Sequence, residues 1–233
     1  MEDYIHLHVH TQYSILDGQA SIKNLLKKAV SDGMRGMAVT DHGNMMGIKE
    51  FFNSVKKLHA DGRDEMKTLS VAPEGETEDE RKIREQKLHK AELKANFKPI
   101  FGCEMYVARR TMHDREGKQD QSGNHLIVLA KNEKGYHNLI KLVSNAWTDG
   151  FYMRPRTDHS QLEQYHEGLI VCSACIAGEV PSKILKGDLQ GAEDAVLWFK
   201  RVFGDDYYLE LQRHEVKDPS QRANRETFPL QQT

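Results

Sequence analysis

The chain has 233 residues, enough for one large domain or two small ones with a substantial core. Its formal net charge of −2 gives no global sign of nucleic-acid binding, so any DNA contact is expected through a local patch or another part of a larger assembly. No apolar run reaches the roughly 20 residues of a membrane span, the acidic start is unlike a signal peptide, and three cysteines are too few for a disulfide framework. These features predict a soluble protein of the reducing cytoplasm with no membrane segment.

The first predicted element is a strand at residues 5–11, in which histidine alternates with apolar residues. His6, His8 and His10 would share one face of this strand and the apolar residues the other, because successive strand side chains point to opposite sides. Three imidazoles on one face favour a metal site over a merely polar strand face, and their alternate spacing differs from that of a contiguous purification tag.

Helix and strand signals alternate in the next part of the chain. Ser21 and Gly33 bracket a helix with apolar residues at helical spacing. Residues 36–40 follow as an apolar strand of the buried kind, and a second helix starts near Ile48. This alternation predicts parallel strands joined by right-handed crossovers.

A strongly charged segment at about residues 61–97 interrupts the alternation. Thr77 and Glu80 have the spacing of a capping box, so a helix is predicted to begin there. This helix has few apolar positions, which predicts a solvent-exposed and flexible helical insertion. A partner-binding role stays open, but the composition favours a solvated excursion.

The alternation resumes after the insertion and gives at least six strands in all. Further strands are predicted at residues 98–107, 125–130, 169–172 and 207–211. Helices are predicted from residue 132, over residues 178–185 and around residues 192–203, with a polar turn or hairpin at 109–123 and the start of a helix at 214–233. No glycine-rich dinucleotide loop follows the first strand, and polar residues collect at strand ends, so an α/β barrel is more natural than an open doubly wound sheet.

Residues of the kind that bind metals recur at the ends of the predicted strands. They are His8, His10, Asp17, Asp41, His42, Glu104, His125 and Cys175. Each has an ordinary explanation on its own, since Asp41 could cap a helix, Glu104 could form a buried ion pair and Cys175 could simply pack. Together with the alternate histidines they favour a metal site, because a parallel barrel brings donors from several strand ends together.

These motifs resemble those of a known family. The chain resembles the polymerase and histidinol phosphatase (PHP) superfamily at residues 6–11, the Asp17-Gly18 pair, residues 40–44 and residues 102–104. Residues 13–18, 135–139 and 168–171 narrow the resemblance to the N-terminal PHP domains of bacterial DNA polymerase III alpha subunits. The similarity covers almost the whole chain except the charged insertion.

The resemblance implies a distorted, TIM-like, seven-stranded (β/α) barrel that binds up to three divalent metals through nine ligands. The positions that match family ligands are His8, His10, Asp17, His42, Glu104, His125 and Cys175. The resemblance also implies that Glu104, His10 and His42 take part in catalysis, with Glu104 as a carboxylate that bridges metal ions. His6 and Asp41 would orient the ligands without binding the metals themselves. Histidine and cysteine favour zinc, and the carboxylates leave room for manganese or iron.

One departure from the family pattern concerns the final ligand pair, an Asp-x-His on a later strand. The last candidate, His214, has Gln212 instead of aspartate two positions before it. The chain is therefore expected to be a C-terminally truncated PHP domain fragment spanning residues 1–233, with seven of the nine ligands, an unclosed barrel and no polymerase domains.

The function that the resemblance implies is metal-dependent phosphoester hydrolysis within a replicative polymerase, a nucleotidyltransferase. A 3′–5′ exonuclease proofreading site would act on the primer 3′ end of DNA, in contact with other replicase subunits. Four arginines are candidate phosphate contacts, although exposed arginines usually only solubilise a surface: Arg109, Arg110, Arg154 and Arg156. Two alternatives are a non-catalytic scaffold, which braces the polymerase core or recruits a separate proofreading exonuclease, and a free-standing histidinol-phosphatase-like enzyme.

Overall fold

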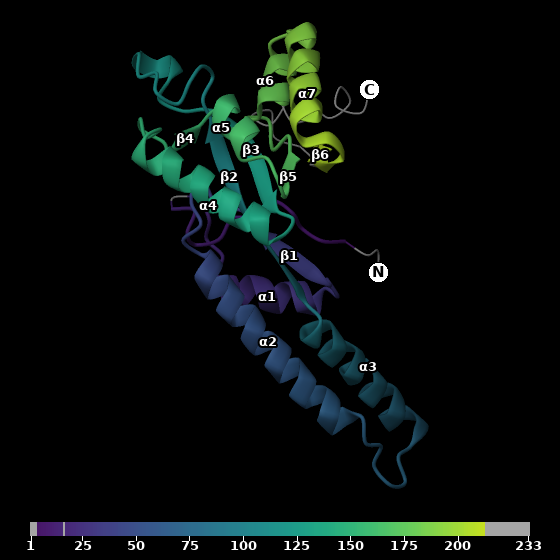
Figure 1. The fold of residues 1–233 in the computed structure, drawn as a ribbon. Coiled ribbons are helices and arrows are strands. Elements are labelled where there is room, and N and C mark those ends of the chain that lie inside the picture. The colour runs from purple at the N-terminus through teal and green to yellow at the C-terminus, as the bar shows by residue number, and fades with distance from the viewer. Residues whose placement is uncertain (1–3, 16, 213–233) are drawn as a thin grey trace. The chain divides into compact units, whose positions relative to one another are not determined.

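The computed structural model describes residues 4–15 and 17–212, which fall into two compact units (Figure 1). The first unit comprises Met1–Val39 and Met46–Ile100, and the second comprises Thr40–Met45 and Phe101–Thr233. Among the helices described, none combines the length and the apolar character that a membrane crossing requires.

The first unit begins with the histidine-rich stretch, where the predicted strand at residues 5–11 is wrong. Residues 4–10 have no strand geometry, although the Ala38 amide donates to the His6 carbonyl at 2.9 Å. Leu7, expected in the core, is 41% exposed. Alternation in a sequence predicts which side chains share a face only if the backbone adopts strand geometry, and alternation alone does not determine that geometry.

The helix and strand that follow confirm the predictions. Helix α1 (Ile22–Ser31) starts at Ser21, whose side chain accepts a hydrogen bond from the Asn24 amide. Gly33 has a φ of 79°, the left-handed conformation that ends a helix and favours glycine. Strand β1 (Gly36–Val39) is buried along its whole length and neighbours β2 (Lys98–Val107) in the sheet.

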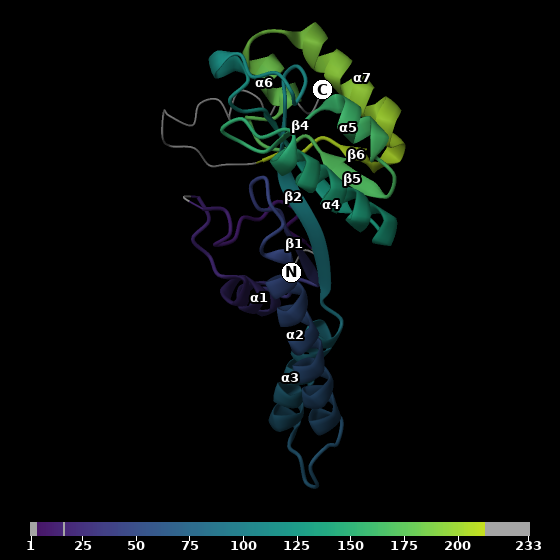
Figure 2. The same cartoon turned by 60° about the vertical axis from the view of Figure 1, so that its left-hand side comes forward.

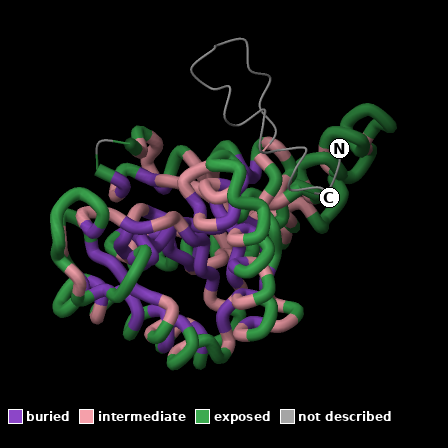
Figure 3. The backbone as a smooth tube through the Cα atoms, turned by 90° about the horizontal axis from the view of Figure 1, so that it is seen from above, coloured by how far each residue is buried: buried purple, intermediate pink, exposed green. Residues whose placement is uncertain are grey.

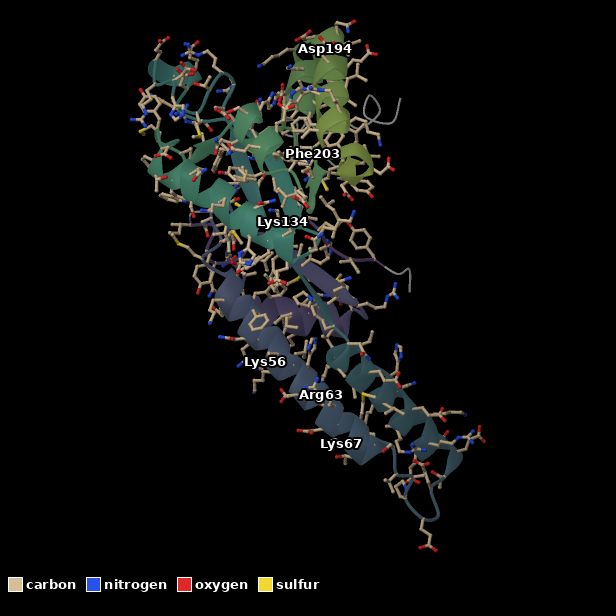
Figure 4. The ribbon with its side chains drawn as sticks, viewed as in Figure 1. Lys56, Arg63, Lys67, Lys134, Asp194 and Phe203 are labelled. Atoms are coloured by element: carbon tan, nitrogen blue, oxygen red, sulfur yellow. The ribbon has the colours of Figure 1, made fainter. Side chains whose placement is uncertain are left out.

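A helical hairpin forms the rest of this unit. Helix α2 (Ile48–Leu69) continues through residue 61 without a break, and α3 (Glu78–Ala95) packs beside it (Figure 2). Gly62 permits close packing, since an added Cβ would lie 2.5 Å from the Ala95 amide nitrogen. The predicted capping box is confirmed at Thr77. Figure 4 labels the charged residues Lys56, Arg63 and Lys67 along α2, all of them exposed.

The sheet of the second unit is open and mixed. Its strands are β2, β3 (Asn124–Ala130), β4 (Arg156–Thr157), β5 (Leu169–Cys172) and β6 (Tyr207–Tyr208), in the order β2-β3-β5-β6 with β4 beside β2. The pairs β2/β3 and β3/β5 are antiparallel, whereas β2/β4 and β5/β6 are parallel. The described strands do not close a barrel, as expected from the sequence, whereas the parallel arrangement expected of the strands is wrong for β2/β3 and β3/β5. Residues 108–123 contain only a short 3-10 helix (Gly117–Gln119), and a connection without a crossover helix turns the chain back antiparallel.

Four helices complete this unit: α4 (Glu133–Thr148), α5 (His159–Gln164), α6 (Glu179–Leu185) and α7 (Leu189–Phe203). Helices α4, α5 and α7 contribute to one apolar core, and α6 packs on α7 in a smaller cluster. A second 3-10 turn, Gly204–Asp206, leads into β6, which is shorter than the strand predicted at residues 207–211. The core joins Met105 of β2 and Val128 of β3 to Leu139 of α4 and Phe199 of α7. Figure 3 shows buried residues at the centre and exposed ones on the surrounding turns. The helix predicted in the tail at residues 214–233 lies outside the described residues.

The buried face of α4 leaves out some of its large apolar residues. Leu139 and Val143 are buried, but Ile140 and Trp147 are 37% and 44% exposed. The buried stripe passes through Gly135, Asn138, Leu139, Leu142, Val143 and Ala146. Small residues on this stripe allow the helix to approach the sheet closely, which turns the larger Ile140 and Trp147 toward solvent.

Candidate metal centre

The acidic member of the site is Glu104, in the middle of β2. Neighbouring Cys103 and Met105 belong to the apolar core. Because strand side chains alternate, Glu104 and Tyr106 point to the opposite face. Glu104 is nevertheless only 1% exposed. A buried carboxylate needs compensating partners, since leaving its charge unpaired away from water is costly.

The first partner, His42, is placed beside Glu104 by backbone pairing. The Glu104 amide donates to the Asp41 carbonyl at 3.1 Å, and the Gly43 amide donates to the Glu104 carbonyl at 2.8 Å. This parallel bridge brings His42 Nδ1 to 2.8 Å from Glu104 Oε2. Gly43 has a φ of 61°, and an added Cβ would lie 2.7 Å from the Pro155 ring, so glycine is required here.

The second partner, His125, comes from the adjacent strand. In the antiparallel register of β2 and β3, His125 stands opposite Tyr106 and therefore faces the same side as Glu104. Its Nδ1 lies 2.9 Å from Glu104 Oε1. Each oxygen of the Glu104 carboxylate therefore contacts a different imidazole.

The loop after β5 adds a sulfur atom. Cys175 Sγ lies 3.6 Å from His125 Nδ1 and 3.9 Å from Glu104 Oε1. The loop is held in place by the His125 amide, which donates to the Ala177 carbonyl at 2.9 Å. Ala174, just before the cysteine, has a φ of 62°, a conformation that is uncommon for alanine. The local backbone thus holds the thiol at the cluster.

The electrostatics of this cluster call for positive charge. Burial lowers the pKa of His125, but its hydrogen bonds to Cys175 and Glu104 outweigh that effect and raise the pKa to about 9. A protonated His125 would therefore balance the buried carboxylate. Ligand atoms of His42, Glu104 and His125 all lie within 4.8 Å of one another, a spacing that suits one cation. Two imidazoles, a carboxylate and a thiol are donors that fit zinc, with manganese or iron as compatible ions.

Tyr106 is a member of this site that the sequence reasoning missed. Its ring stacks on His42 with centroids 6.1 Å apart and meets His125 edge-on at 5.1 Å. The aromatic ring therefore fixes the orientation of both imidazoles. The signal that could have revealed it is its place two residues after Glu104 on the same strand.

Two further predicted ligands, His8 and His10, belong to the first unit. His8 Nε2 and His10 Nε2 are 3.1 Å apart, and His10 Nδ1 lies 3.1 Å from the hydroxyl oxygen of buried Ser14. A hydrogen bond at the far nitrogen is how proteins commonly orient a ligating imidazole. Asp17 follows in the same turn, where its amide donates to the Ser14 carbonyl at 3.0 Å, and its side chain is exposed.

Comparison with known proteins identifies the family of this chain. Residues 6–214 match the family described as PHP domain. The chain belongs to the PHP domain family. The resemblance drawn from the motifs is thereby confirmed at the level of the family.

Similar relatives of this PHP domain carry a polymerase name. DNA polymerase III subunit alpha of Borreliella burgdorferi is 43% identical over 218 residues, which cover 92% of this chain and 16% of the relative. The subunit of the same name from Aquifex aeolicus is 35% identical over 235 residues, covering 98% of this chain and 17% of the relative. The chain thus spans about one sixth of the length of these relatives.

The remaining predicted residues of the PHP domain lie as follows. The ring of His6 packs edge-on against Tyr4, with centroids 4.9 Å apart. Asp41 is buried, and its carbonyl accepts hydrogen bonds from the Glu104 amide and, at 3.4 Å, from the Cys103 thiol. His214 lies outside the described residues.

The four candidate arginines differ in their surroundings. Arg156 is fully buried and donates to the carbonyls of Gly150, Asp114 and Met112 at 2.8 to 3.1 Å. Arg110 pairs with Asp120 at 2.5 Å and Glu116 at 3.1 Å, and Arg109 donates to the Gln119 carbonyl at 2.8 Å. The Arg154 guanidinium lies 5.9 Å from the centre of the Tyr106 ring. Of the four, Arg154 is thus the one in contact with a residue of the metal cluster.

Proposed function

We propose that this PHP domain belongs to a DNA polymerase III alpha subunit and that His42, Glu104, His125 and Cys175 bind a divalent transition metal for phosphoester hydrolysis. The names and identities of the relatives support the polymerase assignment. In that setting the parent protein is a DNA-directed DNA polymerase of the cytoplasm, acting in replication with other replicase subunits.

One observation carries the metal assignment. The two oxygens of buried Glu104 lie 2.8 and 2.9 Å from the Nδ1 atoms of two different histidines. An ordinary buried ion pair needs a single partner of opposite charge, whereas two imidazoles and a nearby thiol around one carboxylate form a donor set. Zinc is the favoured ion, with manganese or iron as alternatives.

Different residues of the chain would have different roles at the proposed metal site. A bound divalent ion would act as a Lewis acid toward a phosphoryl oxygen. Glu104 holds the negative charge that attracts the ion, and Tyr106 keeps His42 and His125 in place through ring contacts. Since Arg109, Arg110 and Arg156 engage backbone carbonyls or acidic side chains, Arg154 is the arginine best placed for a substrate phosphate.

The remaining residues of the proposal come from the first unit and from family resemblance. His8, His10 and Asp17 are proposed as further ligands, up to a total of three ions, with catalytic contributions from His10, His42 and Glu104. The His8 and His10 Nε2 atoms lie 3.1 Å apart, a spacing at which both could ligate one ion.

The proposed substrate is the 3′ end of a DNA strand, which a 3′–5′ exonuclease would shorten. Polymerase relatives support this choice over a free-standing histidinol-phosphatase-like enzyme, because a proofreading site serves a polymerase directly.

A non-catalytic scaffold is the second candidate, and the geometry of the cluster favours it specifically. The donors come from residue 42, from strands β2 and β3 and from the loop after β5. An ion bound by all four would tie these segments together and stabilise the fold, as structural zinc does. The stabilised surface could then brace the polymerase core or recruit a separate exonuclease.

Substitution in the full-length polymerase separates the two candidates. His8→Ala and Glu104→Ala are assayed with manganese on a labelled primer–template with a mismatched 3′ end. Loss of 3′ shortening at an unchanged melting temperature supports catalysis. Loss of stability and of partner binding, with no nuclease activity in the parent protein either, supports the scaffold. Undiminished shortening by both variants contradicts the catalytic proposal.

A further inference from the structure

An exposed aromatic patch lies at the end of α4 and in the loop that follows. Trp147 and Phe151 are each 44% exposed, and Met153 is 64% exposed. The two rings stack with centroids 5.6 Å apart and an interplanar angle of 20°. Large apolar side chains gathered at one place on a surface indicate an interaction site more often than scattered ones do.

The backbone under this patch is rigidly held. Met153 has a φ of 65°, a conformation that costs free energy in a residue other than glycine, and the Tyr152 amide donates to the Arg154 carbonyl at 3.1 Å across it. The backbone at Gly150 is held by buried Arg156, whose side chain donates a hydrogen bond to the Gly150 carbonyl at 3.1 Å. The loop therefore presents its exposed side chains in one arrangement, which lowers the entropic cost of binding.

The patch adjoins the metal cluster within the same unit. The Trp147 indole N–H donates to the Gly43 carbonyl at 2.8 Å, and Gly43 directly follows His42. On the other side, Arg154 lies over the Tyr106 ring, which stacks on His42. Anything that stacks on the aromatic pair is therefore next to the proposed ligands.

Positive charge flanks the aromatic pair. Arg154 is exposed in the loop itself, and exposed Arg115 donates to the Asp149 carbonyl at 2.9 Å beside the end of α4. Stacked aromatic rings with neighbouring guanidinium groups are the combination that binds single-stranded nucleic acid, because bases stack on rings and phosphates contact arginine. A protein partner is less well matched, since only three apolar side chains form the patch.

We propose that Trp147 and Phe151 form a stacking platform for the unpaired bases of a single-stranded DNA 3′ end, with Arg154 and Arg115 contacting its phosphates. This inference rests on the proposed phosphoesterase function and assigns the surface that delivers the strand to the cluster. Met153 borders the platform and covers the strained turn.

The test measures binding of a short oligothymidylate to the purified chain in EDTA, so that neither metal nor hydrolysis enters. The chain has two tryptophans, and the second, Trp198, stacks on His159 away from the patch. In the Trp198→Phe variant the fluorescence comes from Trp147 alone, and oligothymidylate should quench it. In the matched Trp147→Phe variant, oligothymidylate should leave the Trp198 emission unchanged.

The affinity is then compared among variants by fluorescence anisotropy. Phe151→Ala, which leaves the Trp147–Gly43 hydrogen bond in place, should weaken binding at least about fivefold, and Trp147→Ala with Phe151→Ala should weaken it further. Arg154→Gln should reduce the slope of log K against log salt by about 0.7. Leu197→Ala, which removes a 59% exposed apolar side chain on α7, should change nothing.

An abasic oligomer of equal length gives the control for stacking. It should bind more weakly than oligothymidylate and respond to Arg154→Gln but not to Phe151→Ala. Equal binding of oligothymidylate to the double aromatic variant and the parent would overturn the proposal, as would self-association lost in that variant, which would assign the patch to a second copy. Failure of the metal assignment alone would leave all these EDTA results unchanged.

Discussion

Two groups of charged side chains in this molecule have nearly the same geometry and different surroundings. In the helical hairpin of the first unit, Lys94 Nζ lies 2.7 Å from Glu65 Oε1, with side chains 27% and 44% exposed. In the second unit, Glu104 lies 2.8 and 2.9 Å from His42 and His125, and its side chain is 1% exposed. Distance alone therefore does not distinguish a surface pair from a site.

The difference in burial decides what each group contributes. Water solvates Lys94 and Glu65 whether or not they meet, so their pairing adds little free energy. Glu104 has lost its water, and a buried carboxylate is retained only where its partners compensate for it. A charge kept inside at such a cost is a strong indication of function.

The largest expected effect follows from removing the Glu104 charge. Glu104→Gln should weaken divalent metal binding by at least about 100-fold, because it removes the negative charge and replaces one of the two carboxylate oxygens by an NH2 group. Glu65→Gln, the same change in the hairpin, should leave the affinity unchanged. Competition against a chromophoric chelator measures both. Equal affinities of the two variants would mean that burial of Glu104 has no part in metal binding.

Arg156 tests burial of a positive charge away from the metal cluster. Arg156→Ala should destabilise the chain by about 3 kcal/mol or more, because it leaves three buried carbonyls at Gly150, Asp114 and Met112 without their donor. Arg109→Ala removes an exposed guanidinium that also donates to a carbonyl and should cost less than about 1 kcal/mol. Urea unfolding gives both values, and similar values for the two would contradict the distinction.

Glu179 offers an intermediate case, with a side chain 13% exposed. Burial raises its pKa, but contacts with His159 and Lys183 outweigh that effect and hold the pKa below that of an ordinary glutamate. A lowered folded-state pKa means that the stabilisation is present at neutral pH and is lost as the pH falls through the lowered pKa. Glu179→Gln should therefore cost about 1 kcal/mol at neutral pH, and the cost should shrink in acid. A cost that stays constant from pH 7 to about pH 3 would contradict this role.

The smallest effect is expected in the hairpin. Lys94→Ala should change the free energy of unfolding by less than about 1 kcal/mol, and the change should decrease further in high salt. Denaturation at two ionic strengths checks this. A loss as large as that of Arg156→Ala would show that exposed pairs in the hairpin matter as much as buried ones.

The sequence predicted local elements better than their arrangement. Ser21, Thr77 and the apolar spacing of α1 predicted helix starts correctly, because caps act through neighbours in the chain. The parallel direction expected for the strands was wrong for β2 and β3, because strand direction depends on the connection, and the polar turn between these two strands returns the chain antiparallel. The opening strand was wrong because alternation predicts which side chains would share a face but does not determine whether the backbone forms a strand.

The candidate site was predictable in its donors but not in its contacts. Glu104 inside an apolar strand and His125 at a strand entrance were visible as exceptions to their surroundings. Tyr106 could have been predicted from its place two residues after Glu104 on the same strand. The contact of His125 and Glu104 with Cys175 depends on the turn around Ala174, which leaves no distinct signal in the sequence.

The most direct test of the central claim is the metal content of the chain purified without chelators, measured by elemental analysis. At least one equivalent of zinc, manganese or iron per chain is expected. Cobalt substituted into the site should show a sulfur-to-metal charge-transfer band that Cys175→Ser removes. A chain that holds no stoichiometric transition metal, and that shows no such band with cobalt, would contradict the assignment of His42, Glu104, His125 and Cys175 as a metal centre.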